Sequence, residues 1–324
     1  MAWSSRVRRR IPPNCLTIPF GLAGLGASWR ASEAVLGITP AAADAIFILA
    51  ALVWLVVLAW YLAQGLRQLR DDLRDPVMTP FVPVAVITPM LLSAALSSAA
   101  FTAGRVLVII FLALTVVFGG WLTGQWIVAG DLDQDKAHPG YFLPTVAGGL
   151  AGASAAAIVH LHAVAEASFG IGIIWWLMLG STVLSRLLFR PAVPTALVPT
   201  LAIEMAPPAL AGLAYFAVNG GSINFIASAL GGYAVFMALV QLRFVPLYAR
   251  LRFSPGVWAF TFSYAAAATD ALLWIRFGRP AGATGYAIAT LTLITVLIAA
   301  IAARTVIDIA RGQFLPAPQP LAVP

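Results

Sequence analysis

Two carboxylic acids stand inside long apolar stretches of the sequence. Glu204 lies three residues before Pro207, hence on roughly the same face of a helix, and Asp270 follows a run of four alanines. A carboxyl group in such a stretch is costly to bury and marks a functional site unless it is paired. For Glu204 two interpretations stay open: an ion pair with a cytoplasmic arginine, which we favour, and a proton-coupling group. For Asp270 we favour a pair with Arg276 or Arg105.

Acidic loops suggest a second chemistry, that of a metal-dependent enzyme. The stretch "DDLRD" at 71–75 matches the D-D-x-x-D pattern that binds magnesium and diphosphate in membrane prenyltransferases, and "DLDQD" at 131–135 is a second acidic loop. However, Arg67, Arg70 and Arg74 are interleaved with the first loop, so neutralising pairs at a solvated helix end explain it better. The prenyltransferase stays a remote alternative.

Metal-binding and nucleophilic residues are otherwise scarce. His160 and His162 have no cysteine or acidic cluster beside them, which makes a metal site an unfavourable interpretation. His138 precedes a proline and is expected to cap or anchor a helix. The single Cys15 excludes an internal disulfide. We therefore expect no enzyme: no catalytic residue, no metal and no cofactor.

Composition places these groups in a membrane. Of 324 residues 61% are hydrophobic and 10% are charged, and the mean hydropathy is +0.93. A soluble protein with that balance would have a largely apolar surface, so we predict an all-α polytopic membrane protein that forms a single domain over 1–324. Ten membrane spans are predicted, at 16–33, 42–66, 80–100, 104–128, 141–163, 168–189, 196–218, 222–245, 256–276 and 284–308.

Charge predicts the orientation of these spans. Fifteen of the 19 Lys and Arg fall at the two ends and in the loops on the same side as the ends. The other side holds four, namely Arg30, Arg105, Arg276 and Arg279. By the positive-inside rule both termini are cytoplasmic, with short tails at about 1–15 and 309–324, which requires an even number of spans.

A repeat connects alternate spans. Five segments begin with a proline or aromatic residue and continue with very small residues, at 19–29, 89–99, 144–154, 207–217 and 262–272. Gly, Ala and Ser fill 30 of these 55 positions but only 12 of 55 in matching windows of the even spans. We predict five helical hairpins, with small-residue odd helices forming an inner ring and bulky even helices facing lipid.

Prolines head four of the five segments. They are Pro19, Pro89, Pro144 and Pro207. A proline within a helix frees a backbone carbonyl, which in a membrane is tolerated only inside protein or beside water. We therefore expect four helix kinks that line a wet path.

The repeated segments carry a resemblance. The stretches "IPFGLAGLG" (18–26), "AHPGYFLPTVA" (137–147), "IEMAPPALAG" (203–212) and "VWAFTFSYAAAA" (257–268) resemble the tellurite-resistance/dicarboxylate transporter family in order and spacing. That family includes bacterial TehA-type proteins and the slow anion channels of plant guard cells. The resemblance implies ten helices around a quasi-fivefold axis, a pore lined by the odd helices, and a trimer of independent pores.

Phe262 is the residue to which the resemblance assigns a gate. It matches the phenylalanine that plugs the pore in the ninth helix of the family. The small residues after it leave space in which a ring could lodge and close the path to ions. Phe260, two residues away, faces a different side of a helix.

The expected function is that of an anion channel or facilitative anion transporter gated by Phe262. Chloride, nitrate, sulfite, tellurite and C4-dicarboxylates remain candidate substrates, and a proton-coupled secondary transporter is the alternative. The expected location is the bacterial inner membrane. Small anions and the lipid bilayer are the expected partners, in a homotrimer, without nucleic acid.

Overall fold

A computed structural model describes residues 10–129 and 134–315 of the chain, and within these ranges it is helical without a strand. The long helices are α1 (Thr17–Leu36), α2 (Ala41–Leu62), α4 (Val84–Leu96), α5 (Phe101–Ala129), α6 (Gly148–Ile158), α7 (His162–Phe189), α8 (Ala206–Asn219), α9 (Phe225–Tyr248), α10 (Ala259–Gly278) and α11 (Ala283–Ala310). A short α3 (Leu66–Arg74) follows α2. Each predicted span coincides with one long helix and the turn that leads into it.

Eight helical segments of the described chain are long and apolar enough to cross a membrane. They confirm a polytopic helical membrane protein. The two long helices outside this group are α1 and α10, which match the predicted spans 16–33 and 256–276. Both carry charged residues, such as Arg30 in α1 and Asp270 in α10.

The small-residue helices form the inside of the bundle. Contacts run from α1 to α4, α4 to α6, α6 to α8, α8 to α10 and from α10 back to α1, so these five helices close a ring. Each also packs on the long helix that follows it in sequence, as α1–α2, α4–α5, α6–α7, α8–α9 and α10–α11. The structure thus contains the expected helical hairpins.

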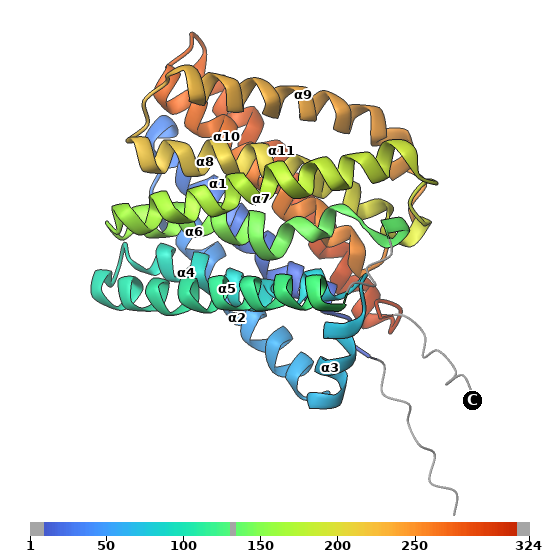
Figure 1. The fold of residues 1–324 in the computed structure, drawn as a ribbon. Helices are drawn as coiled ribbons and strands as arrows, with labels where there is room; N and C mark the ends of the chain where they lie inside the picture. Colours follow the sequence, from blue (N-terminus) through green and yellow to red (C-terminus); the bar gives the residue numbers. More distant parts are fainter. Residues whose placement is uncertain (1–9, 130–133, 316–324) are drawn as a thin grey trace, which may run out of the picture.

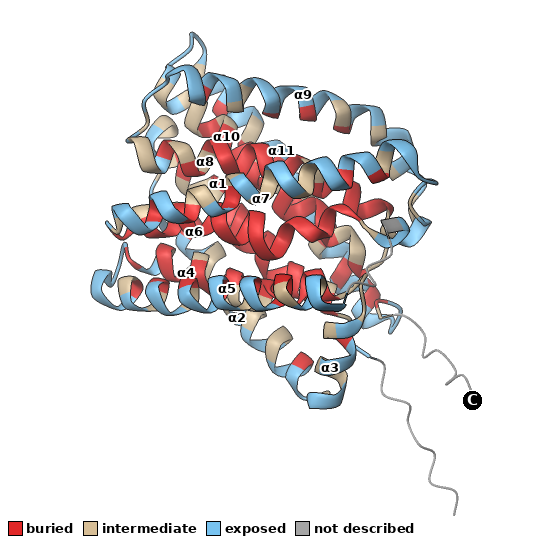
Figure 2. Cartoon of the chain, in the orientation of Figure 1, coloured by how far each residue is buried: buried red, intermediate tan, exposed pale blue. Residues whose placement is uncertain are grey.

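Burial separates the two layers (Figure 2). In an apolar 18-residue stretch of each segment that ends in α4, α6 or α8, 67–89% of residues are buried, against 17–33% in the corresponding stretches of α2, α5, α7, α9 and α11. The outer helices expose large apolar side chains such as Val117, Leu177, Val235 and Leu293. Because such a surface is unfavourable in water, its natural surroundings are lipid tails.

A proline-containing turn leads into every inner helix. These turns are η1 (Pro13–Leu16), η2 (Thr79–Phe81), η4 (Pro139–Tyr141) with the π-helical η5 (Leu143–Ala147), η6 (Thr195–Met205) and η7 (Pro255–Trp258). Proline suits such a position because the first turn of a helix has no use for its missing N–H.

Three of the four expected kink prolines stand at these junctions. Pro89 alone lies inside an α-helix, as expected. Pro19 is in the first turn of α1, where no earlier carbonyl of the helix is freed, so the kink expected there is wrong. Pro144 lies within the π-turn η5, and Pro207 stands at the start of α8, directly after η6. From the sequence alone, a proline that kinks an α-helix cannot be distinguished from one that stands where a turn of another helix type changes into an α-helix.

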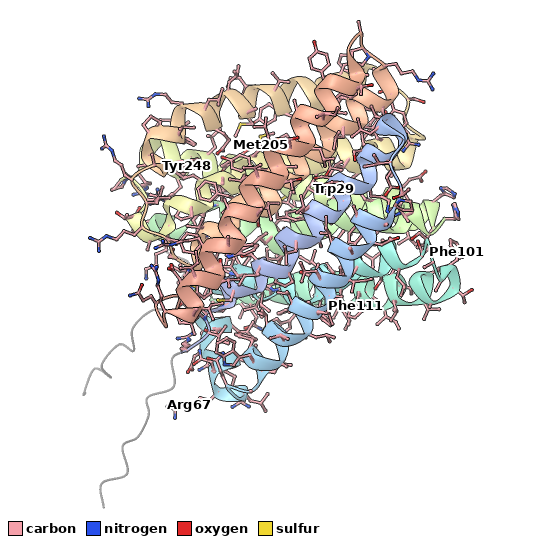
Figure 3. All side chains as sticks on the ribbon, turned by 180° about the vertical axis from the view of Figure 1, so that it is seen from behind. Trp29, Arg67, Phe101, Phe111, Met205 and Tyr248 are labelled. Carbon is pink, nitrogen blue, oxygen red and sulfur yellow. The ribbon has the colours of Figure 1, made fainter. Side chains whose placement is uncertain are left out.

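The described chain begins and ends at the same end of the bundle (Figure 1). Arg10 forms an ion pair there with Asp72 of α3. Seen from behind, Arg67 lies at this end and Phe101 at the opposite end (Figure 3). Of the arginines used to predict orientation, Arg6, Arg8 and Arg9 lie outside the described residues.

Candidate functional site

Two phenyl rings meet inside the ring of inner helices. Phe262 of α10 stacks on Phe20 of α1, with ring centroids 3.5 Å apart and planes inclined by 14°. Phe20 is 1% exposed and Phe262 is 7% exposed. Each is the fourth residue of its helix. Sequence analysis missed Phe20, although its place beside Pro19 at the head of the first small segment parallels that of Phe262.

Glycines on α1 allow α10 to approach this closely. A Cβ atom on Gly24 would lie 3.3 Å from Cδ2 of Phe262 and 2.9 Å from Cβ of Ala265. A Cβ atom on Gly21 would overlap the side chain of Thr261. Any larger residue at either position would therefore push the two helices apart. Packing against α10 thus explains Gly21 and Gly24 of "IPFGLAGLG", whereas a Cβ atom on Gly26 would meet Phe47 of α2.

Polar contacts hold the same two helices further along. The Ser28 hydroxyl lies 2.9 Å from Thr269 Oγ1 and 3.2 Å from the carbonyl oxygen of Ala265. Thr269 Oγ1 also donates to that carbonyl, at 2.8 Å. α10 continues unbroken through Ser263, whose hydroxyl donates to the Ala259 carbonyl oxygen at 3.0 Å. The helix that carries Phe262 is thus tied to α1 on the C-terminal side of the ring.

Phe260 faces away from Phe262, as expected from the helical period. Its ring contacts the ring of Tyr248 edge-on, with centroids 4.7 Å apart. It is also stacked with the ring of Tyr264, with centroids 5.9 Å apart. It belongs to a separate apolar cluster that includes Trp258, whereas Phe262 packs with Phe20.

Glu204 lies in η6, just before α8, and its Oε1 is buried without a hydrogen-bond partner. The favoured ion pair with an arginine is wrong for the described part of the chain, where the ion pairs involve other acids. A polar network lies on neighbouring helices: Gln241 Nε2 donates to the Leu201 carbonyl oxygen at 3.0 Å. The hydroxyls of Tyr248 and Tyr264 both donate to Gln241 Oε1, at 2.8 and 2.9 Å.

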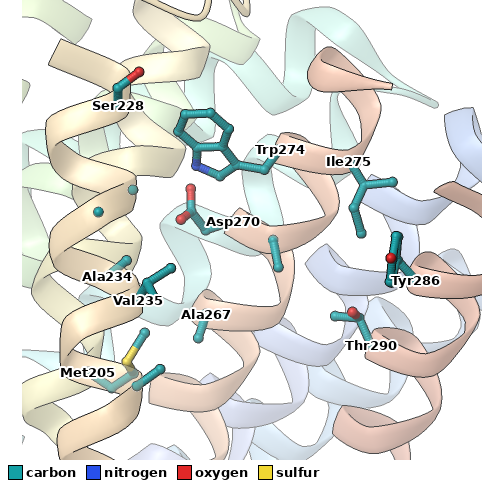
Figure 4. A pocket seen from close by; sticks show the side chains of 14 residues that line it. Met205, Ser228, Ala234, Val235, Ala267, Asp270, Trp274, Ile275, Tyr286 and Thr290 are labelled. Atoms are coloured by element: carbon teal, nitrogen blue, oxygen red, sulfur yellow. The ribbon is translucent and has the colours of Figure 1, made fainter. Parts of the chain in front are cut away.

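Asp270 is 4% exposed and borders a cleft of about 720 Å³ between α9, α10 and α11 (Figure 4). Its side chain lies against Gly212 of α8, where any Cβ atom would collide with the carboxyl group. The expected pair with Arg276 or Arg105 is wrong: within the described residues Asp270 has no ion pair, and Arg276 lies 5.2 Å from the ring of Phe277. The rotation of α10 directs Asp270 toward α8 and α9.

His138 anchors the turn before α6, as expected. Its Nδ1 accepts from the Gly140 N–H at 3.1 Å, and its Nε2 lies 3.1 Å from the Val77 carbonyl oxygen. Burial lowers the pKa of His138 to about 4, despite the opposing hydrogen bond to Val77. The ring is therefore neutral at pH 7, and it joins η4 to the chain before η2.

The first acidic loop forms a structural contact. Asp72 is fully buried; its Oδ2 accepts from the Tyr61 hydroxyl at 2.8 Å and its Oδ1 from Gln68 Nε2 at 3.0 Å. Its ion pair is with Arg10, not with the arginines interleaved in the loop.

Asp135 of the second loop is described, whereas 131–133 lie outside the described residues. His160 lies between α6 and α7, and its ring centroid is 6.3 Å from that of His162, the first residue of α7. The described residues contain no cluster of metal-ligating side chains.

Known proteins are similar to this chain over almost its whole length. The chain is 26% identical to the Tellurite resistance protein TehA homolog of Haemophilus influenzae over 307 residues, which cover 94% of this chain and 92% of that protein. The family model described as voltage-dependent anion channel, SLAC1, matches residues 10–306. This span includes the ring of inner helices and the Phe20–Phe262 pair. The protein is thus an integral membrane protein that belongs to the voltage-dependent anion channel (SLAC1) family, whose members are anion channels or transporters.

Proposed function

We propose that this protein conducts small anions along a path between its five inner helices, and that Phe262 closes this path. The observation that carries the proposal is the stacked Phe20–Phe262 pair inside a ring of helices with small side chains. A phenyl ring in a narrow apolar passage blocks ions by filling it and by excluding water. Pro89, Pro144 and Pro207 would line the same path beside Pro19.

The proposed path requires α1 and α10 to cross the membrane with the eight apolar segments. Each has 20 residues, which at about 1.5 Å per residue corresponds to the roughly 30 Å hydrocarbon core. Because both lie within the ring rather than on its outer surface, they need less hydrophobicity than a lipid-facing helix. Ten spans around a quasi-fivefold axis then form one domain over 1–324, with both termini in the cytoplasm of a bacterial cell.

Passive conduction is tested by reconstituting the protein in liposomes and measuring anion flux at a fixed voltage and a fixed pH gradient. A channel predicts flux that follows voltage and continues without a pH gradient. The same assay ranks chloride, nitrate, sulfite, tellurite and C4-dicarboxylates as substrates. Crosslinking in the membrane tests the proposed homotrimer. Absence of anion flux from correctly inserted protein would contradict the proposal.

A proton-coupled carrier is the second candidate, because Oε1 of Glu204 is buried without a hydrogen-bond partner and Glu204 has no ion pair in the described chain. If Glu204 carried the coupled proton, Glu204→Gln would abolish flux driven by a pH gradient, since an amide cannot exchange a proton. We expect the opposite: Glu204→Gln keeps both voltage-driven flux and its pH dependence. Asp270→Asn in the same assay controls for the loss of another buried carboxyl group. Selective loss of pH-driven flux in Glu204→Gln would favour the carrier.

A further inference from the structure

The outer layer of the bundle has a gap beside α10. Four outer helices pack not only on their hairpin partner but also on the next inner helix of the ring, as α2 on α4, α5 on α6, α7 on α8 and α11 on α1. The described residues show no such packing between α9 and α10; α9 packs on α8 and η6. The cleft of about 720 Å³ that Asp270 borders lies at this position. It therefore interrupts a packing pattern that the other hairpins repeat.

The cleft opens on the surface that faces lipid. Val235 of α9 and Tyr286 of α11 contribute to its lining and are 64% and 58% exposed. One end is closed by the ring of Trp274, which lies against α9: a Cβ atom on Gly231 would be 2.6 Å from Cζ2 of Trp274. A molecule dissolved in the bilayer can thus enter from the side, between two outer helices.

Asp270 places a carboxyl group without a counter-charge inside this apolar cleft. It is 4% exposed and is the one charged side chain among the described residues that line the cleft. Its Oδ1 is enclosed beside Gly212 and has no hydrogen-bond partner, whereas Oδ2 keeps accessible surface. Figure 4 shows the carboxyl group between α9 and α10, next to Trp274, with Ala267 and Met205 beyond it. A carboxylate in such surroundings is stabilised by a positive charge brought in by a ligand.

We propose that this cleft binds an amphiphile with a protonated primary amine and an alkyl chain. The ammonium group pairs with Asp270 through Oδ2, and the chain lies along Ala234, Ala267 and Met205, which line the apolar part of the cleft. A primary ammonium supplies both the missing charge and N–H donors, and charge-assisted hydrogen bonds are the strong ones. Neither Phe20 nor Phe262 lines the cleft, so the inference does not rest on the conduction path proposed above.

The binding test uses the full chain purified in detergent and tritiated n-decylamine, with bound ligand measured by scintillation proximity. The parent is expected to bind decylamine saturably. Two unlabelled competitors isolate the chemistry of the head group. Decan-1-ol has the same chain without a charge, and decyltrimethylammonium has the charge without an N–H donor. Each is expected to compete at least about tenfold less well than unlabelled decylamine.

Asp270→Asn is the first variant, and its apparent affinity for decylamine is expected to fall at least about tenfold. The amide keeps the shape of the side chain beside Gly212 and loses only the charge that attracts the ammonium. Glu204→Gln is the matched control, because it removes another buried carboxyl group that does not line the cleft. It should bind decylamine as the parent does.

Gly232→Leu is the second variant, and it keeps Asp270. Gly232 lines the cleft, and a Cβ atom there meets nothing within 4 Å, so leucine fills the cleft without disturbing the helices around it. The affinity for decylamine is expected to fall at least about tenfold because the alkyl chain loses its space. Gly120→Leu on α5 is the control: this exposed glycine has the same free space but lies outside the cleft, and binding should be unchanged.

Three results would overturn the proposal. Equal competition by decan-1-ol and decylamine would show a site for apolar chains that does not use the charge of Asp270. Unchanged decylamine affinity in both Asp270→Asn and Gly232→Leu would place the amine elsewhere on the protein. Absence of saturable binding, with a cysteine at Val235 crosslinking to a second copy in a chain that carries Cys15→Ala, would show that another copy of the chain covers the cleft.

Discussion

Phe262→Ala is expected to increase anion conductance by about tenfold or more, measured as current in oocytes or flux in liposomes. A factor of ten corresponds to about 1.4 kcal/mol of barrier, so removing even part of a steric and dehydrated block has a large effect. The substitution removes the ring that stacks on Phe20 with centroids 3.5 Å apart. The residue one turn later on the same face of α10 is Ala266, which is also small. The current should stay selective for anions, because only the block is removed.

Phe260→Ala is the matched control for this result. It removes the same ring from the same helix, two residues away, on the side that contacts Tyr248. If both variants raise conductance equally, loosening of α10 rather than opening of a gate is the cause. Unchanged current in Phe262→Ala with normal surface expression would contradict the gate.

Phe20→Leu is expected to raise conductance as well, but by less than Phe262→Ala. The ring of Phe20 holds that of Phe262 in place, and an aromatic pair contributes about 0.5–1.5 kcal/mol beyond the area it buries. Leucine keeps most of the apolar volume, which limits the loss of stability that alanine would cause at a position 1% exposed.

The double variant Phe20→Leu with Phe262→Ala separates a shared gate from two independent effects. If Phe20 acts through the Phe262 ring, the double variant conducts no more than Phe262→Ala alone. Additive increases would show that Phe20 obstructs the path independently. A lower current in Phe20→Leu at equal protein level would contradict the role assigned to the pair.

The two-layer arrangement of the bundle could be predicted from sequence because it depends on composition repeated along the chain. Small residues recur on alternate helices, and these helices are the ones that contact each other in a ring. The position of His138 at the start of a helical turn was predictable from a local pattern, because a capping residue followed by proline is typical of helix starts. Local patterns of this kind need no knowledge of the partner.

Pairs of distant residues could not be predicted in this way. Arg30, a residue of the sparsely charged side, contacts Glu33 and forms an ion pair with Asp44, while Glu204 and Asp270 have no ion pair in the described residues. Which charges meet depends on the rotation of each helix, and a shift of one residue turns a side chain by about 100°. The Phe20–Phe262 contact was missed because two segments at opposite ends of the chain supply it.

The central claim is that anions pass beside Phe262, and modification of a cysteine placed there tests it most directly. Ala266 is 4% exposed, lies one turn after Phe262 and shares its apolar cluster. In a chain with Cys15 replaced by Ala, an anionic methanethiosulfonate reagent should block the current of Phe262→Ala with Ala266→Cys. The same reagent should leave Phe262→Ala with Ala265→Cys unaffected, because Ala265 packs in the other cluster. Full modification of the cysteine at 266 without loss of current would contradict a path between the inner helices.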